Sequence, residues 1–155
     1  MLKYYNYDVV FQEVPDEVSL AINLTNCPNH CPACHSPHLW EDIGAELTEN
    51  ELNRLVEIYS GDITCVCIMG GDAAKNEVES LAHYIKNTLK LRVAWYSGRY
   101  DKPLNINDFD YIKFGPYIDE KGGLKSPDTN QKFYKVVDGN LKDITYRFFP
   151  RKTNV

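Results

Sequence analysis

Three cysteines lie within eight residues of this chain, in the sequence Cys27-Pro-Asn-His-Cys31-Pro-Ala-Cys34. Their spacing is C-x3-C-x2-C, and the two intervening prolines stiffen the loop so that three sulfurs can converge on one metal centre. Three thiolates suit a cubane iron–sulfur cluster in which one iron has no protein ligand, because a fourth cysteine would close the cluster. We therefore interpret Cys27, Cys31 and Cys34 as the metal ligands of a [4Fe–4S] cluster.

Two other interpretations of the cysteine loop stay open. A nearby histidine, which would be His30, His35 or His38, would complete a structural Cys3His zinc site. Zinc ligands usually come as two separated pairs, whereas all these candidates lie in one loop, so the pattern favours the cluster. In the other interpretation the cysteines are structural and bind no metal.

The remaining cysteines, Cys65 and Cys67, are two residues apart on a predicted strand and therefore share one face of it. Cysteine without a metal or redox role behaves as a small hydrophobic residue. We therefore predict that both are buried in the core.

The composition favours one cytoplasmic domain spanning residues 1–155. Of the 155 residues, 43% are hydrophobic and 25% are charged, and the formal net charge is −5. A chain of this length can bury a sizeable core. The negative charge, without a basic run, argues against binding to nucleic acid or to an anionic membrane. No apolar run approaches the ~20 residues that span a bilayer, and the first residues lack the apolar core of a signal peptide.

Strands and helices alternate along most of the chain. Apolar runs predict four strands, at residues 18–24, 63–69, 91–96 and 110–114. One helix is predicted after the capping box at 48–51, and a second is predicted from apolar residues at helical spacing between Val78 and Leu89. This order implies right-handed βαβ units and a mostly parallel sheet.

Two further β elements are predicted outside this alternation. Residues 132–149 are typical of a β-hairpin, because Asp138-Gly139 supplies the positive φ angles of a tight turn. Residues 4–11 predict a short β element near the N-terminus.

The candidate functional residues lie just past the ends of the predicted strands. The cysteine loop follows the first strand, and later strands are followed by Gly70-Gly71-Asp72, by Ser97-Gly98 and by Gly115-Pro116. In parallel α/β folds the carboxyl edge of the sheet is where sites are built. Taken alone, Gly70-Gly71 is better explained by an ordinary strand-to-helix turn, and the neighbouring Trp95 and Tyr96 by packing.

The order and spacing of these motifs resemble the radical S-adenosylmethionine (AdoMet) superfamily, and within it the anaerobic ribonucleoside-triphosphate reductase activating proteins. The resemblance covers nearly the whole chain. After the cysteine loop it continues through His35-Ser36-Pro37, Trp40, Met69–Asp72, Tyr96–Gly98, Phe114–Tyr117 and Thr129–Gln131.

The resemblance implies a fold. We expect an α/β protein that forms an incomplete, open (β/α) barrel of the radical AdoMet type with a C-terminal β-hairpin. The barrel is expected to be incomplete because a closed eight-unit barrel typically needs ~250 residues.

The resemblance also implies a glycyl-radical activating oxidoreductase. AdoMet would be cleaved reductively at the [4Fe–4S] cluster, and the resulting 5′-deoxyadenosyl radical would take hydrogen from a glycine of the anaerobic ribonucleoside-triphosphate reductase. Reduction of a sulfonium requires a low potential, so an external electron donor such as flavodoxin is implied. The alternatives are another small radical AdoMet enzyme, either a pyruvate formate-lyase-type activase or a small-molecule enzyme, and a non-enzymatic zinc-binding module.

Site residues follow from the same resemblance. Cys27, Cys31 and Cys34 would carry catalysis through the cluster. Contacts with AdoMet are expected from the loop and from the strand ends, at Ala33, Cys34, His35, Gly70, Gly71, Asp72 and Ser97. In the family a carboxylate commonly occupies the position of Phe114, and alternation predicts that its neighbour Lys113 points to the other face of the strand.

Overall fold

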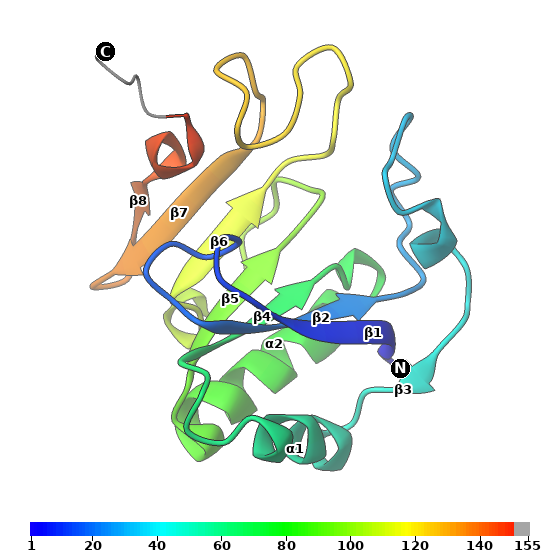
Figure 1. Ribbon diagram of the computed structural model, residues 1–155, viewed down its shortest axis with the longest axis vertical. Helices are drawn as coiled ribbons and strands as arrows, with labels where there is room; N and C mark the ends of the chain where they lie inside the picture. Colours follow the sequence, from blue (N-terminus) through cyan, green and yellow to red (C-terminus); the bar gives the residue numbers. More distant parts are fainter. Residues whose placement is uncertain (151–155) are drawn as a thin grey trace.

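The computed structural model describes residues 1–150, and these form one eight-stranded sheet with helices against it (Figure 1). The strand order is β3-β1-β2-β4-β5-β6-β7-β8. The strands are β1 (Lys3–Val10), β2 (Ser19–Leu24), β3 (Ala45–Glu46), β4 (Cys65–Met69), β5 (Arg92–Tyr96), β6 (Tyr111–Phe114), β7 (Lys132–Val137) and β8 (Asn140–Asp143). Within residues 1–150, no helix has the length and apolar character needed to cross a membrane.

The helical elements are few and mostly short. The two α-helices are α1 (Glu49–Ile58) and α2 (Lys75–Tyr84), and α2 runs on into a π-helical turn, η3 (Ile85–Leu89). The short 3-10 helices are η1 (Pro37–Trp40), η2 (Asp72–Ala74), η4 (Ile106–Asp108) and η5 (Thr145–Phe148). The predicted capping box is confirmed, because the Thr48 side chain accepts a hydrogen bond of 3.1 Å from the Glu51 amide.

Four neighbouring strands at the centre of the sheet are parallel. β2 pairs with β4, β4 with β5 and β5 with β6, all in parallel register. Antiparallel strands flank this centre, with β1 and β3 on one side and β7 and β8 on the other. The carboxyl ends of the four parallel strands therefore meet along one edge.

The expected incomplete (β/α) barrel is wrong, because residues 1–150 form a mixed eight-stranded sheet with only two α-helices. A barrel of this type needs a helix after each strand. The connection from β5 to β6 contains only the short helix η4, and the connection from β6 to β7 contains no helix. Both connections lack apolar residues at helical spacing. No α-helix therefore forms in them, and the sheet lacks the helices that a barrel would need there.

The predicted C-terminal hairpin is confirmed, since β7 and β8 pair in antiparallel register. Asp138 and Gly139 both have positive φ, at 51° and 78°, as a two-residue hairpin turn requires. The second strand is shorter than the sequence predicts, because β8 ends at Asp143 and η5 follows. There the Thr145 hydroxyl donates to the Asp143 carboxylate at 2.6 Å and accepts from the Phe133 amide at 2.9 Å, next to the backbone hydrogen bond of 2.9 Å from the Ile144 amide to the Phe133 carbonyl.

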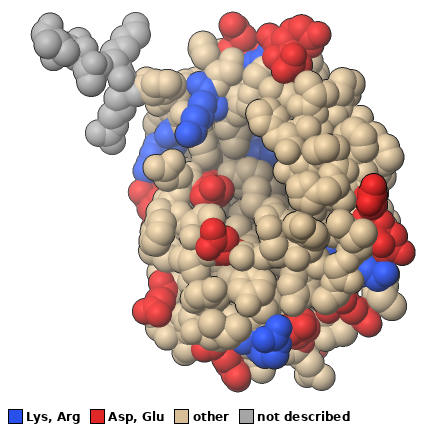
Figure 2. Space-filling view, turned by 45° about the vertical axis from the view of Figure 1, so that its right-hand side comes forward, with Lys and Arg blue, Asp and Glu red and all other residues tan. Residues whose placement is uncertain are grey.

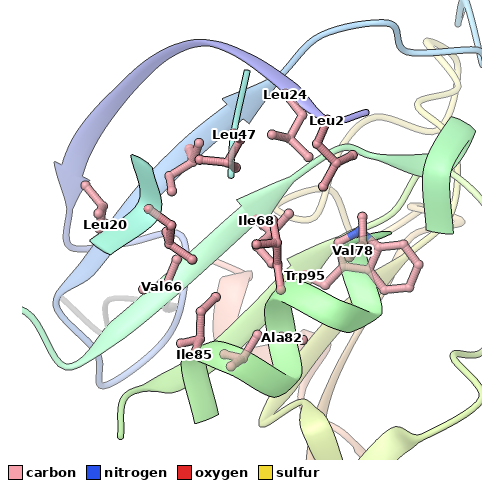
Figure 3. Packing of buried hydrophobic residues seen from close by; sticks show 14 of the residues in the cluster. Leu2, Leu20, Leu24, Leu47, Val66, Ile68, Val78, Ala82, Ile85 and Trp95 are labelled. Carbon is pink, nitrogen blue, oxygen red and sulfur yellow. The ribbon is translucent and has the colours of Figure 1, made fainter. Parts of the chain in front are cut away.

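The larger core lies between the sheet and the two α-helices (Figure 3). Alternate strand residues such as Leu20, Ile68 and Trp95 point to this side, where α2 contributes Val78 and Ala82. The spacing of apolar residues in strand and helix therefore defines this layer as the sequence predicts.

The opposite face of the sheet carries short side chains at its centre. Ala21, Cys65, Cys67 and Ala94 lie there and are at most 2% exposed. Burial raises the pKa of the Cys65 thiol to about 12 and also raises that of Cys67. The prediction that these two cysteines act as small buried hydrophobic residues is thus confirmed.

Replacing Ile68 with alanine should lower the free energy of unfolding by about 2–5 kcal/mol, because the 1%-exposed side chain leaves a cavity between the sheet and α2. The matched change Ile58→Ala, at a position 52% exposed, should alter it by less than about 0.5 kcal/mol. Urea unfolding followed by circular dichroism measures both. Equal losses in the two variants would contradict this assignment of the core.

Candidate functional site

The carboxyl edge of the parallel strands carries every residue that the sequence assigns to the site. The cysteine loop follows β2, Gly70-Gly71-Asp72 follow β4, and Ser97 follows β5. The parallel pairing of these strands confirms the prediction that the three segments meet at one edge. The fit of each residue to a cofactor then depends on local geometry.

The cysteine loop has an unusual backbone. Asn26, His30 and Ala33 have positive φ angles of 60°, 44° and 60°. Residues other than glycine rarely adopt this conformation, and it persists only where the surroundings impose it. Backbone hydrogen bonds of 3.1 and 3.0 Å, from Asn26 and Cys27 to carbonyls within residues 39–41, hold the start of the loop.

The three loop thiols are free and partly exposed. Two accept hydrogen bonds: Cys27 from the side-chain amide of Asn29 at 3.7 Å, and Cys34 from the Ser36 backbone amide at 3.4 Å. Hydrogen bonds to sulfur are among the features that tune iron–sulfur clusters.

The thiols are not gathered into a finished metal site. Within residues 1–150, no group of three or more His, Cys, Asp or Glu side chains is arranged to hold a metal ion. As a donor set, three thiols on one loop fit a cluster with one open iron, and Cys27, Cys31 and Cys34 would hold it.

The histidines near the cysteines contact aromatic rings rather than thiols. The three ring pairs are His30 with Trp40, His38 with Tyr5 and His35 with Tyr117. The first pair is stacked with centroids 4.6 Å apart, and His35 Nε2 also lies 3.4 Å from the Tyr117 hydroxyl. In the described part of the chain, no histidine joins the cysteines in a metal-binding group.

Asp72 ties the separate segments of the edge together. Its carboxylate accepts hydrogen bonds from the Ser97 hydroxyl at 2.5 Å, the Gly98 amide at 2.8 Å and the Asn29 side chain at 2.7 Å. Asn29 also contacts the Cys27 sulfur, so Asp72 is one residue removed from a predicted metal ligand. Asp72 and Ser97 are 9% and 1% exposed, which places this junction inside the protein.

The geometry of the turn accounts for both glycines after β4. Gly70 and Gly71 have φ angles of 111° and 92°, and a Cβ atom on Gly71 would lie 2.4 Å from Val78. The Gly70 amide donates to the Tyr96 carbonyl at 3.0 Å, and its own carbonyl accepts from the Trp95 indole at 2.8 Å. The backbone groups of Gly70 therefore already have partners within the protein.

Lys113 points to the site side of the sheet. Phe114 turns into the helix-side core, while the Lys113 ammonium donates to the carbonyls of Ser97 and Gly115, both at 3.0 Å. Its nitrogen lies 5.6 Å from the centroid of the Tyr96 ring. The prediction that Lys113 and Phe114 point to opposite faces of the strand is confirmed, and the face that carries Lys113 is the one on which its ammonium reaches Ser97 and the Tyr96 ring.

Burial lowers the pKa of the Lys113 amine to about 8. The negative charges of Asp72, Cys31 and Cys27 oppose the shift, since each favours the protonated amine. A lysine that is 8% exposed therefore lies within the electrostatic reach of both the loop and Asp72.

Sequence reasoning missed three polar residues of this edge, namely Lys113, Asn29 and Arg99. The Arg99 guanidinium donates to the Asn29 side-chain oxygen at 3.1 Å and so extends the network around Asp72. A charged residue inside the apolar strand β6 was a usable signal for Lys113. Asn29 and Arg99 carry no comparable signal, because their pairing depends on how two loops approach each other.

A cavity of about 490 Å³ opens beside the cysteine loop. His35 comes from that loop. The other walls come from residues 12–13, Tyr96, Tyr117, residues 123–125, Gln131 and Phe148. Figure 2 shows the surface hollowed near the centre of its view, with basic atoms inside the hollow. The hollow therefore offers a positive charge to an anionic group.

No protein-family model, curated protein or solved structure matches this chain. Its fold and edge define an α/β protein with a thiol-bearing loop at the carboxyl ends of parallel strands.

The buried Lys113 predicts a pH effect on stability. Its folded pKa of about 8 is below the ordinary 10.5, so between these values the unfolded chain binds a proton that the folded chain does not. Raising the pH through this window should therefore stabilise wild type relative to Lys113→Met, by up to about 3 kcal/mol.

Urea unfolding at several pH values from 8 to 10.5 measures this difference, with reductant present. The exposed Lys142→Met serves as the matched control and should follow wild type. If the free energy of unfolding of wild type, measured relative to that of Lys113→Met, fell as the pH rose, the assigned environment of Lys113 would be contradicted.

Proposed function

We propose that this chain is a glycyl-radical activating oxidoreductase that uses a [4Fe–4S] cluster and AdoMet to act on anaerobic ribonucleoside-triphosphate reductase. The observation that carries the proposal is the C-x3-C-x2-C loop at the carboxyl edge of four parallel strands, hydrogen-bonded through Asn29 to Asp72. Three thiols at this edge leave one iron of a cubane cluster free for a ligand.

A cluster bound in this loop would supply an iron without a protein ligand and one electron for the reductive cleavage of AdoMet to methionine and a 5′-deoxyadenosyl radical. The chain's own residues would hold and surround it. Cys27, Cys31 and Cys34 would hold the irons, while the Asp72 carboxylate accepts hydrogen bonds from Ser97, Gly98 and Asn29 and so fixes these segments in place. Lys113 provides a buried cation near Ser97 and the Tyr96 ring.

The openness of the edge supports a protein substrate. The loop cysteines are partly exposed, and the adjoining cavity opens to the surface instead of enclosing a small molecule. A glycine-bearing segment of a partner reductase would enter here. An external low-potential donor of the flavodoxin type would supply one electron for each AdoMet cleaved.

Cleavage of AdoMet should depend on the loop thiols. After anaerobic reconstitution with iron and sulfide, dithionite and AdoMet should yield 5′-deoxyadenosine with wild type and only background amounts with Cys31→Ala. Cys65→Ala removes a buried sheet thiol instead and should keep the activity. Liquid chromatography measures the product.

Adding the reductase then tests the substrate. Electron paramagnetic resonance should show a glycyl-radical doublet that requires AdoMet and wild-type activating protein. If iron-loaded wild type forms no 5′-deoxyadenosine, the proposed chemistry is wrong. If it forms 5′-deoxyadenosine but no radical doublet, only the proposed substrate is wrong.

A further inference from the structure

Cys31 and Cys34 are the first and last residues of a β-turn in the cysteine loop. The Cys34 amide donates to the Cys31 carbonyl at 3.1 Å, and Ala33, at the third position of the turn, has a φ of 60°. Pro32 stands at the second position, where its ring fixes φ at about −65°. A proline followed by a residue with positive φ is the arrangement of a type II turn.

This turn brings the two cysteines within the range of a disulfide bond. The first and last Cα atoms of a β-turn are less than about 7 Å apart, and disulfides usually join cysteines whose Cα atoms are about 4.4–6.8 Å apart. Both thiols are free and partly exposed, so a small molecule can approach them while the chain stays folded.

Cys27 belongs to a separate, anchored part of the loop. Its backbone amide donates to the Leu39 carbonyl at 3.0 Å, and its sulfur accepts from the Asn29 side chain at 3.7 Å. Asn29 in turn donates to the Asp72 carboxylate at 2.7 Å and accepts from the Arg99 guanidinium at 3.1 Å. Drawing Cys27 toward either of the other loop cysteines would disturb these contacts. The turn therefore selects one pair of loop thiols out of the three possible pairs.

The two sheet cysteines are shielded from the same chemistry. Cys65 and Cys67 are 0% exposed, and burial raises the pKa of both thiols. Thiol–disulfide exchange requires an accessible thiolate. These two residues therefore serve as internal controls for reactions of the loop.

We propose that Cys31 and Cys34 form a reversible disulfide, which makes the turn a redox-sensitive modification site. The oxidant is a small-molecule disulfide such as oxidised glutathione. One protein thiolate attacks this disulfide, which forms a mixed disulfide and releases one glutathione thiolate. The second protein thiolate then attacks the mixed disulfide and releases the other glutathione. The two protons of the protein thiols pass to the released glutathiones, so two protein thiols are oxidised and one small disulfide is reduced.

The bond should be easy to reduce again. It closes a ring of only four residues, so it constrains the unfolded chain little and adds little stability. Exposed disulfides are the labile and regulatory ones, whereas structural disulfides resist reduction. A dithiol such as dithiothreitol would therefore restore both thiols.

The disulfide would decide whether the loop can bind a metal. Oxidation removes two of the three thiols that would hold a cluster, and a Cys3His zinc site would lose the same two. It also spares these thiols from the irreversible sulfinic and sulfonic products of stronger oxidation. The proposal goes beyond the proposed function, because it concerns the metal-free loop and holds whichever metal that loop binds.

Tandem mass spectrometry tests the pairing on the reduced, metal-free full chain. Anaerobic incubation with oxidised glutathione should give one disulfide, between Cys31 and Cys34, and leave Cys27 as a thiol or a glutathione adduct. Cys27→Ser should form the same disulfide at a rate within about twofold of wild type. Cys34→Ser should instead retain glutathione on Cys31, because no second thiol then stands across the turn.

Two substitutions at the exposed Ala33 separate the effect of the turn from mere closeness in sequence. Ala33→Gly keeps the positive φ without a Cβ atom and should close the disulfide at least as fast as wild type. Ala33→Val places a β-branched residue at positive φ, which disfavours the turn, and should slow closure about tenfold. Circular dichroism spectra that match wild type show that each variant is folded.

Several results would overturn the proposal: no disulfide, a disulfide that includes Cys27, modification of the sheet cysteines, or equal closure rates in the two Ala33 variants. Failure of dithiothreitol to restore both thiols would overturn the reversibility. The assay requires neither iron nor AdoMet. A disulfide between Cys31 and Cys34 without AdoMet cleavage by the iron-loaded protein therefore overturns only the proposed function. AdoMet cleavage without this disulfide overturns only the modification site.

Discussion

The carboxylate of Asp72 accepts three hydrogen bonds at the point where β4, β5 and the cysteine loop meet. The donors are a side-chain hydroxyl, a backbone amide and the side chain that also contacts the Cys27 sulfur. Inside a protein such donors cost free energy when left unpaired, so one buried carboxylate stabilises the relative position of three segments. The parallel sheet brings these segments near each other, and Asp72 fixes their spacing.

Most of the sheet was predictable from apolar periodicity, because strands and helices with one buried face repeat at two and at 3.6 residues. Whether the sheet would close into a barrel was not predictable in this way. The connection between β5 and β6 consists of loops and the short helix η4. Its composition does not indicate how the sheet curves when no α-helix covers it there. The end of β8 depends on one threonine side chain that pairs with Asp143 and Phe133, a choice that residue type alone does not fix.

The site residues were predictable by type and by their place after strands, as the positions of Asp72 and Ser97 show. Their partners were not. Alternation predicts that Lys113 and Phe114 face opposite sides of β6, but it does not indicate which of the two sides lies near the site residues. The role of Asn29 depends on Asp72, which is distant in the sequence and which its side chain reaches only in the folded protein.

The central claim is that the loop of Cys27, Cys31 and Cys34 holds an iron–sulfur cluster. The most direct test offers iron with sulfide and zinc in equal amounts under anaerobic conditions, and then measures both metals per chain by mass spectrometry. The account predicts a brown protein with about four irons per chain and little zinc. A colourless protein with about one zinc per chain would contradict it and support a structural zinc site instead.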